Sequence, residues 1–198
     1  MTGRAQAEGE RVEPVVAEDW SAWLAANHER AAGVWLVTWK KATGRQVLTY
    51  EAAVIEALRF GWVDATANSL DDERSMLWFA PRKARSGWSA PNKRRIAELT
   101  AAGRMAPAGQ AAVDRAKEDG SWALLDDVEA LVVPDDLAAA FDRHPGSAAS
   151  WEAFPRSAKR GILEWIVQAK RADTRARRIE ETAARAAVGE RANQWRRP

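Results

Sequence analysis

Residues 62–66, Trp-Val-Asp-Ala-Thr, and residues 76–82, Met-Leu-Trp-Phe-Ala-Pro-Arg, decide the fold. Both stretches are short and rich in aromatic and β-branched side chains, and a polar loop at residues 68–73 separates them. This pattern predicts an antiparallel hairpin. Residues 34–40, Val-Trp-Leu-Val-Thr-Trp-Lys, have the same character. We therefore expect a small antiparallel three-stranded sheet.

Helical periodicity surrounds these strands. Trp20, Trp23 and Leu24 are spaced to share one face of a helix that begins near Asp19. Thr49 precedes a second apolar-periodic stretch and is the expected helix cap. From Ser89, the expected cap of the next helix, the pattern is helical almost throughout. Pro107 stands at an expected helix start, and Ile162 and Ile166 lie on the apolar stripe of a predicted core helix at residues 157–170. The predicted fold class is therefore α+β, a three-stranded sheet with helices followed by an all-helical C-terminal part.

The predicted organisation has four parts. Residues 1–17 are expected to be a flexible acidic tail, and residues 18–105 an α+β domain. Residues 106–188 should form a helical C-terminal domain packed on the first, and residues 189–198 a frayed tail. Eleven tryptophans stand against one tyrosine and four phenylalanines, so tryptophan should carry much of the packing.

The composition excludes several kinds of site. There is no cysteine, so disulfides, thiolate metal sites and cysteine nucleophiles are excluded. The two histidines, His28 and His144, lie far apart in the sequence, and no P-loop, dinucleotide-binding or zinc-protease motif is present. We expect no metal and no cofactor, and the sequence carries no recognisable catalytic motif.

Hydropathy points to a cytoplasmic protein. Residues 1–18 contain several charged side chains and no apolar stretch of the kind a signal peptide has. No apolar run approaches the roughly 20 residues that a bilayer-spanning helix needs. We therefore expect no membrane partner.

Charge is small overall but uneven along the chain. The net charge is +2, with 30 basic and 28 acidic residues. Basic residues predominate in residues 82–104 and again in residues 156–178. These two segments raise the hypothesis of a nucleic-acid-binding protein, but the small net charge argues against nucleic acid as a partner. Solvated helix faces and docking against the acidic residues 118–142 are the alternative explanation.

One patch has the residue types of a binding site. Alternation along the strands places Trp62 and Asp64 on one face, and we expect Trp78 and Arg82 of the partner strand on the same face. Downstream residues then lead into a helix start, which favours anions. The predicted ligand-binding residues are Trp62, Asp64, Arg82, Ser86, Trp88, Ser89 and Asn92. The structural alternative is that the tryptophans pack under helices.

A second basic run lies at residues 170–178. If Asp173 caps a helix, Arg175 and Arg178 fall on one side of it, and Lys170 precedes it. These three residues are candidate anion contacts. Solvated charge on a terminal helix is the alternative.

Several short motifs together resemble a known family. They are Ala57–Asp64, Phe79–Lys83, Ser86–Ser89, Asn92–Arg94, Gly103–Met105, Pro107–Gly109, Trp122, Ala169–Lys170 and Thr174–Ile179. Residues 18–188 thereby resemble the bacterial YdeI/OmpD-associated family, also labelled bacteriocin-protection proteins. Gly87 stands where this family usually has Asn, and Ala106 where it usually has Thr.

The resemblance implies protection against bacteriocins or cationic antimicrobial peptides, and an association with an outer-membrane porin. The porin association fits poorly with a chain in which we find no export signal. The leading hypothesis is a cytoplasmic stress-protection module that binds a small anionic or carbohydrate-like ligand. The alternatives are an enzyme with Asp64 as base and Arg82 stabilising negative charge, and the nucleic-acid-binding protein. The oligomeric state is not predicted.

Overall fold

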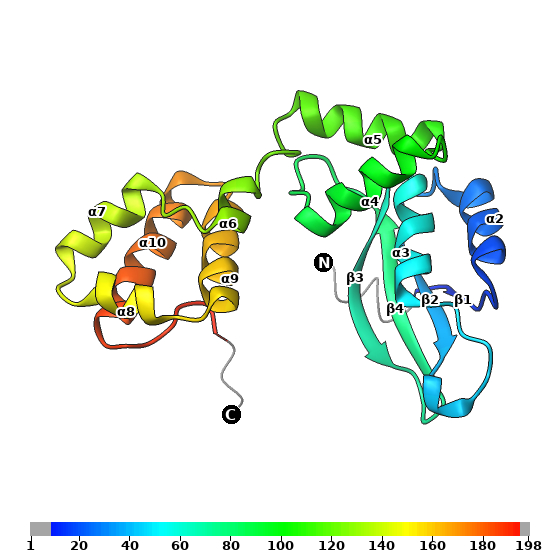
Figure 1. Ribbon diagram of the computed structural model, residues 1–198, viewed down its shortest axis with the longest axis horizontal. Helices are drawn as coiled ribbons and strands as arrows, with labels where there is room; N and C mark the ends of the chain where they lie inside the picture. The colour runs from blue at the N-terminus through cyan, green and yellow to red at the C-terminus, as the bar shows by residue number, and fades with distance from the viewer. Residues whose placement is uncertain (1–8, 195–198) are drawn as a thin grey trace. The chain divides into compact units, whose positions relative to one another are not determined.

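The computed structural model describes residues 9–194, and these form two compact units (Figure 1). Unit 1 comprises residues 9–86 and 91–120, and unit 2 comprises residues 87–90 and 121–194. This division differs from the predicted boundary at residue 105, because the helix that follows that residue belongs to unit 1. Residues 1–8 and 195–198 of the two predicted tails lie outside the described residues.

Unit 1 contains all the strands and the first four α-helices of the described chain. Its elements are β1 (Arg11–Val12), α2 (Ala17–Asn27), β2 (Val34–Trp39), the short 3-10 helix η1 (Lys41–Thr43), α3 (Tyr50–Arg59), β3 (Trp62–Ser69), β4 (Arg74–Pro81), α4 (Ala90–Ala101) and α5 (Pro107–Glu118). The first residue of α4, Ala90, belongs by its contacts to unit 2. Within residues 9–194, no helix is both long and apolar enough to cross a membrane.

The sheet is mixed and has four strands in the order β1-β2-β4-β3. β2 and β3 each pair antiparallel with β4, as the hairpin pattern predicts. The fourth strand, β1, pairs parallel with β2 through Arg11 and Val12. The predicted three-stranded antiparallel sheet is wrong in this detail, and part of the predicted tail 1–17 is sheet. A strand of two residues is too short to show the alternation by which strands are recognised.

The pairing register assigns the faces of the hairpin. Trp62 lies opposite Pro81, and Asp64 lies opposite Phe79. Directly opposed residues share a face of a sheet, so Asp64 lies on the face of Phe79 and not on that of Trp78. The predicted shared face of Trp62, Asp64, Trp78 and Arg82 is therefore wrong. Alternation groups residues within one strand, but register decides which groups meet, and a one-residue shift reverses the result.

Tryptophans pack on both faces of this sheet. On one face Trp20 of α2 packs against Phe79, with ring centroids 5.4 Å apart, and its indole N–H donates to the carbonyl oxygen of Ala53 in α3 at 3.1 Å. On the other face Trp35 and Trp78 meet edge to face at 5.2 Å, and both are buried. Each face thus holds large aromatic surface, as the composition predicts.

Helix α3 and helix α5 approach each other very closely. Thr49 caps α3 by accepting from the backbone N–H of Ala52 at 3.2 Å, as predicted. At the other helix, a Cβ on Gly109 of α5 would lie 2.0 Å from the carbonyl oxygen of Arg59 in α3. Only a glycine at this position lets the two backbones come so near, and this contact places α5 in unit 1.

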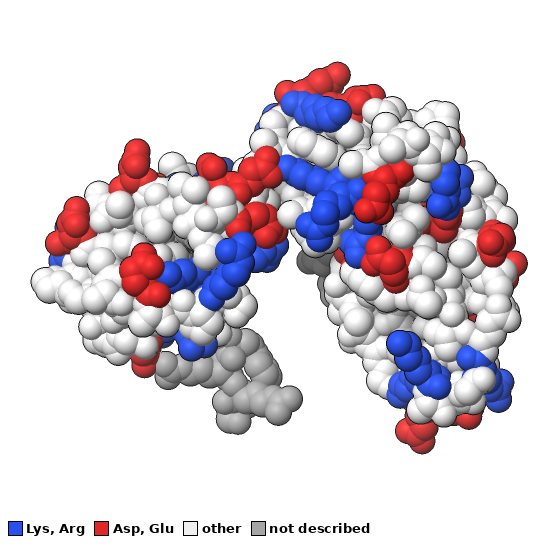
Figure 2. All heavy atoms as spheres, viewed as in Figure 1, with Lys and Arg blue, Asp and Glu red and all other residues white. Residues whose placement is uncertain are grey.

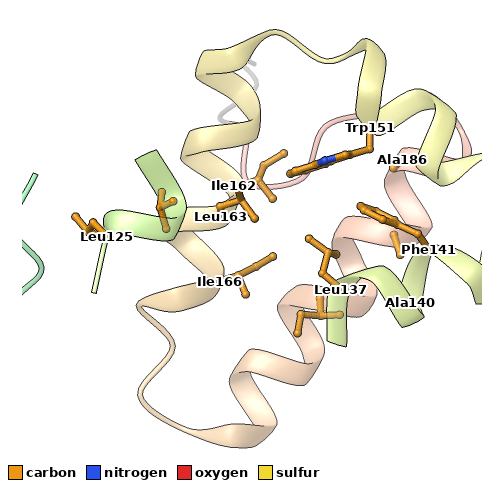
Figure 3. Close-up of a cluster of buried hydrophobic side chains, with 12 residues drawn as sticks. Leu125, Leu137, Ala140, Phe141, Trp151, Ile162, Leu163, Ile166 and Ala186 are labelled. Atoms are coloured by element: carbon orange, nitrogen blue, oxygen red, sulfur yellow. The ribbon is translucent and has the colours of Figure 1, made fainter. Parts of the chain in front are cut away.

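Unit 2 is helical throughout its regular structure. Its helices are α6 (Asp126–Ala130), α7 (Asp135–Arg143), α8 (Ser147–Ala153), α9 (Arg156–Val167) and α10 (Ala172–Ala187). Their core side chains converge in Figure 3, where Trp151 of α8 and Phe141 of α7 face Ile162 and Ile166 of α9. The two aromatic rings lie 5.5 Å apart. The predicted core stripe of α9 is confirmed, because Ile162 and Ile166 are buried.

Candidate functional site

A cavity of about 290 Å³ lies within unit 1, where the ends of α2, α3 and β4 meet helix α5. Two of the predicted ligand-binding residues, Trp62 and Arg82, line it. The other lining residues are His28, Glu29, Phe60, Gly61, Pro81, Ala108, Ala111, Ala112 and Arg115. We call this cavity the Arg82 pocket.

Backbone geometry explains why Arg82 reaches this pocket. Arg82 follows directly on the last residue of β4, and its backbone N–H donates to the carbonyl oxygen of Gly61 at 3.0 Å. Gly61 has a φ of +77°, in the left-handed region that favours glycine, and it turns the chain from α3 into β3. This turn holds the start of Arg82 against the wall of the pocket.

Trp62 forms part of the pocket wall. Its side chain is fully buried, and its indole N–H donates to the carbonyl oxygen of His28 at 3.0 Å. The hydrogen bond fixes the end of α2, and the imidazole of His28 lies 5.7 Å from the ring of Phe60. Trp62 therefore shapes the pocket mainly as a structural residue.

The electrostatics of the pocket favour an anion. Burial lowers the pKa of Arg82 to about 10, and the nearby charge of Asp64 opposes this shift. The guanidinium therefore stays charged at neutral pH, but it has lost part of its hydration. Arg115 adds a second, exposed guanidinium, and Glu29 supplies one carboxylate. Two arginines against one glutamate suit a ligand that carries negative charge.

Asp64 and Asn92 lie in a separate polar cluster of unit 1. The hydroxyl of Tyr50 donates to the Asp64 carboxylate at 3.0 Å, and Arg95 donates to the Asn92 side-chain oxygen at 2.7 Å. Arg95 also binds both carboxylate oxygens of Glu51, at 2.7 and 2.6 Å. Partial burial and the hydrogen bond to Asp64 raise the pKa of the Tyr50 hydroxyl. Asp64 is thus tied to a tyrosine, an arrangement that the enzyme hypothesis did not anticipate.

The remaining predicted residues have local roles. Ser86 donates from its hydroxyl to the carbonyl oxygen of Lys83 at 2.7 Å. Trp88 and Ser89 belong to unit 2, where the fully buried Trp88 ring lies 5.1 Å from that of Trp122. Ser89 directly precedes α4, as its predicted capping position requires. Neither Trp62 nor Trp88 offers an exposed aromatic face, so a ligand site built from both indoles stays a prediction without support from these contacts.

The structure shows what surrounds Gly87 and Ala106, the two positions at which the chain differs from the family pattern. A Cβ on Gly87 would lie 2.8 Å from a side-chain carbon of Leu125, so this position in unit 2 has no room for an asparagine without a shift. Ala106 is the N-cap residue of α5, and no side chain caps this helix. Pro107 at the first helical position suits the helix start in its place.

The basic run at residues 170–178 is largely committed to intramolecular contacts. Arg175 binds both carboxylate oxygens of Asp136, at 2.8 and 2.9 Å. Arg178 donates to the carbonyl oxygen of Trp165 and stacks over its ring at 4.9 Å. Lys170 is exposed between α9 and α10. Anion binding by Arg175 and Arg178 would have to compete with these contacts.

Surface charge is mixed on the face drawn in Figure 2. Basic and acidic side chains lie next to one another over both units, and no continuous basic surface covers either unit on this face. This pattern lends no support to the nucleic-acid hypothesis, which requires a basic groove or stripe.

Sequence reasoning missed His28, Phe60 and Arg115 as neighbours of Arg82. These residues come from three helices or their ends and are separated by tens of residues in the chain. No motif or spacing connects them, so only the folded structure brings them together.

Two families of known proteins match the chain. Residues 12–112 match the domain of unknown function DUF8412. Residues 130–189 match OmdA, described as "Bacteriocin-protection, YdeI or OmpD-Associated", which confirms the resemblance seen in the sequence. The resemblance was expected over residues 18–188, whereas the OmdA match is confined to unit 2.

No curated protein and no solved structure matches the chain. The DUF8412 match covers 101 of the 198 residues, from β1 to the middle of α5, and all of these except residues 87–90 belong to unit 1. The chain therefore belongs to the DUF8412 family, and residues 130–189 of its helical unit are similar to the YdeI/OmpD-associated, bacteriocin-protection family.

Proposed function

We propose that unit 1 binds a small anionic ligand in the Arg82 pocket. The observation that carries this proposal is the position of Arg82, a largely buried guanidinium that lines a cavity together with Arg115. A partly desolvated guanidinium forms strong, charge-assisted hydrogen bonds with a carboxylate or phosphate.

The walls of the pocket narrow the class of ligand. Phe60, Pro81 and the alanines of α5 supply apolar surface, and Glu29 supplies an acceptor for a hydroxyl or ammonium group. The volume of about 290 Å³ is near the lower end of small-molecule pockets, which begin at about 300 Å³. These features suit a hydroxylated anion of sugar-phosphate or hydroxy-acid size.

The role in the cell is a wider proposal. The OmdA description supports a part in protection against bacteriocins, and we propose that ligand binding in unit 1 serves this protection. The cytoplasmic location and a role in the stress response stay predictions. The hypothesis of an enzyme that uses Asp64 and Arg82 together has less support, since Asp64 accepts a hydrogen bond from Tyr50 and does not line the Arg82 pocket.

Binding can be tested by isothermal titration of the full chain with inorganic phosphate and a set of sugar phosphates. Arg115→Met removes the exposed guanidinium, so we expect unchanged thermal stability and at least about tenfold weaker binding, which corresponds to about 1.4 kcal/mol. Lys41→Met is the matched control, because it removes an equally exposed charge of unit 1 away from the pocket.

The two variants distinguish binding in the Arg82 pocket from a general effect of charge. Binding that Arg115→Met weakens and Lys41→Met preserves would support the proposal. Equal loss in both variants would reveal a general charge effect, and no binding of any anion would overturn the proposed function. Arg82→Met should abolish binding, with circular dichroism used to verify that this variant folds.

A further inference from the structure

A second hollow in unit 1 has a different chemistry from the Arg82 pocket. It encloses about 200 Å³ between the sheet and the start of α3. Figure 1 shows the reason, because β3 and β4 continue past the beginning of α3 and leave the end of the sheet without this helix. The lining residues are Leu36, Thr38, Leu48, Tyr50, Ala53, Ala67, Ser75, Met76 and Leu77. We call this space the Leu77 hollow.

Strand register builds the floor of the hollow. Leu36 of β2 and Ala67 of β3 both lie opposite Leu77 of β4, and Thr38 lies opposite Ser75. These five residues therefore share the face of the sheet on which α3 packs. Leu36 is buried, and the floor is apolar apart from two hydroxyl groups.

A β-bulge makes room in this floor. Between Asp64 and Ala67 the pairing of β3 with β4 shifts, so that β3 carries one extra residue. The shift brings the small side chain of Ala67, and not a larger one, opposite Leu77. Bulges redirect side chains in this way and often lie beside functional sites.

The chemistry of the lining identifies the ligand class. Among the described residues that line the hollow none carries a formal charge, so an ion would be poorly held. The hydroxyl oxygens of Thr38 and Ser75 lie 3.5 Å apart and offer both a donor and an acceptor. An apolar cavity of about 150 Å³ holds a benzene ring, so the space here suits one ring with a small polar substituent.

We propose that the Leu77 hollow binds a small, neutral aromatic molecule with one hydroxyl group, of the phenol class. The ring packs among Leu36, Leu48 and Leu77, and the hydroxyl group bonds to Thr38 and Ser75. This site is independent of the Arg82 pocket, with which it shares no residue.

The test is titration of the full chain with phenol and with toluene, observed by ¹H–¹³C NMR of the methyl groups. Saturable shifts of leucine methyls with phenol, and at least about tenfold weaker shifts with toluene, are expected if the hydroxyl pair contributes a directed contact. Ala67→Leu fills the hollow and should abolish the phenol shifts. Ala97→Leu is the matched control, since it adds the same side chain to an exposed position of unit 1, in α4, that does not line the hollow.

If Ala67→Leu fails to fold, Ser75→Val serves as a second test, because the loss of one hydroxyl should remove the preference for phenol over toluene. Saturable phenol binding that survives in a folded Ala67→Leu variant, a preference for phenol that survives Ser75→Val, or no saturable binding in the unmodified chain would overturn the proposal. Phosphate binding in the Arg82 pocket should be the same in the Ala67→Leu and Ala97→Leu variants, so the two proposals fail separately.

Discussion

The two units of this protein keep their helices in place by different means. In unit 1 the junction of α3 with its neighbours is built around a buried carboxylate, Glu56, which accepts from Arg59 and from Arg104, the latter at 2.7 Å. In unit 2 the helices meet through aliphatic and aromatic side chains, and ion pairs such as Arg143 with Glu180 lie at the surface. Buried charge demands exact partners, whereas apolar packing tolerates substitution of similar volume.

This difference coincides with the positions of the cavities. The Arg82 pocket and the Leu77 hollow both lie in unit 1. In unit 1 the strands of the sheet continue past the helix that covers them, and this leaves space that side chains do not fill. The side chains of α7 to α10 in unit 2 point toward one another, as Figure 3 shows. Unit 1 is therefore the unit in which we expect ligands to bind. The difference in packing between the two units can be tested in three ways.

The largest effect is expected at Glu56. Glu56→Ala leaves Arg59 and Arg104 without their common partner and removes a residue that is 5% exposed. The free energy of unfolding of unit 1 should fall by about 3 kcal/mol, the lower end of the range for breaking a buried pair. Chemical denaturation and hydrogen exchange of peptides from α3 and α5 would measure this change.

Glu51→Ala is the control for this experiment. Glu51 lies on the same helix and pairs with Arg95, but its side chain is 56% exposed. Its loss should cost less than about 1 kcal/mol, as is usual for exposed pairs. Equal effects of the two substitutions would show that the buried carboxylate has no special part in unit 1.

Two helical glycines should respond with opposite signs. Gly109→Ala places a Cβ against the backbone of Arg59, so α5 must move and unit 1 should lose about 2 kcal/mol. Gly161→Ala in α9 of unit 2 meets nothing within 4 Å, so it should stabilise by about 0.5–1 kcal/mol through helix propensity. Urea denaturation of both variants compares them directly. Destabilisation by Gly161→Ala, or a neutral Gly109→Ala, would contradict the difference in packing between the units.

The smallest effect concerns pH and the surface charges of unit 2. Hydrogen bonds from Arg160, at 2.8 and 3.1 Å, lower the pKa of Glu129. A carboxyl group whose pKa is lower in the folded than in the unfolded chain stabilises the folded state at pH values above its pKa in the unfolded chain, about 4.3. This stabilisation is lost as the pH falls through the pKa of the folded state. Glu129→Gln should therefore cost about 1 kcal/mol at pH 7.

The pH dependence distinguishes this pair from a general effect of charge. The difference in unfolding free energy between Glu129→Gln and the unmodified chain should shrink as the pH is lowered from 5 to about 3. Asp142→Asn, which removes an exposed negative charge elsewhere in unit 2, is the control and should show a smaller effect at pH 7. A Glu129→Gln difference that stays constant over this range would exclude the ion pair as its source.

The secondary structure was predictable because its signals are local. Thr49 as a helix cap, Pro107 at a helix start, and the apolar spacing of Ile162 and Ile166 depend on residues within one or two turns. The hairpin of β3 and β4 was predictable for the same reason, since short aromatic and β-branched stretches on either side of a polar loop form one. The family resemblance also came from short motifs in order along the chain.

The candidate site was predictable only in part. Arg82 and Trp62 were identified from the sequence, and both line the same pocket. Their partners His28 and Arg115 come from distant helices, and contacts between distant residues leave no periodic trace in a sequence. The surroundings of Trp88 could not be predicted, because an indole next to a helix start has the same sequence pattern whether it faces a ligand or, as here, packs on Trp122.

The sequence by itself determined the kind of most elements, the α+β class and the wealth of tryptophan, because propensity and periodicity act between near neighbours. Only the tertiary structure decided that β1 joins the sheet, that Asp64 lies opposite Phe79, and that α5 belongs to unit 1. Each of these outcomes depends on which surfaces meet. Register follows from a bulge and a turn acting over the whole hairpin, and the place of α5 follows from one glycine, Gly109, that allows two backbones to touch.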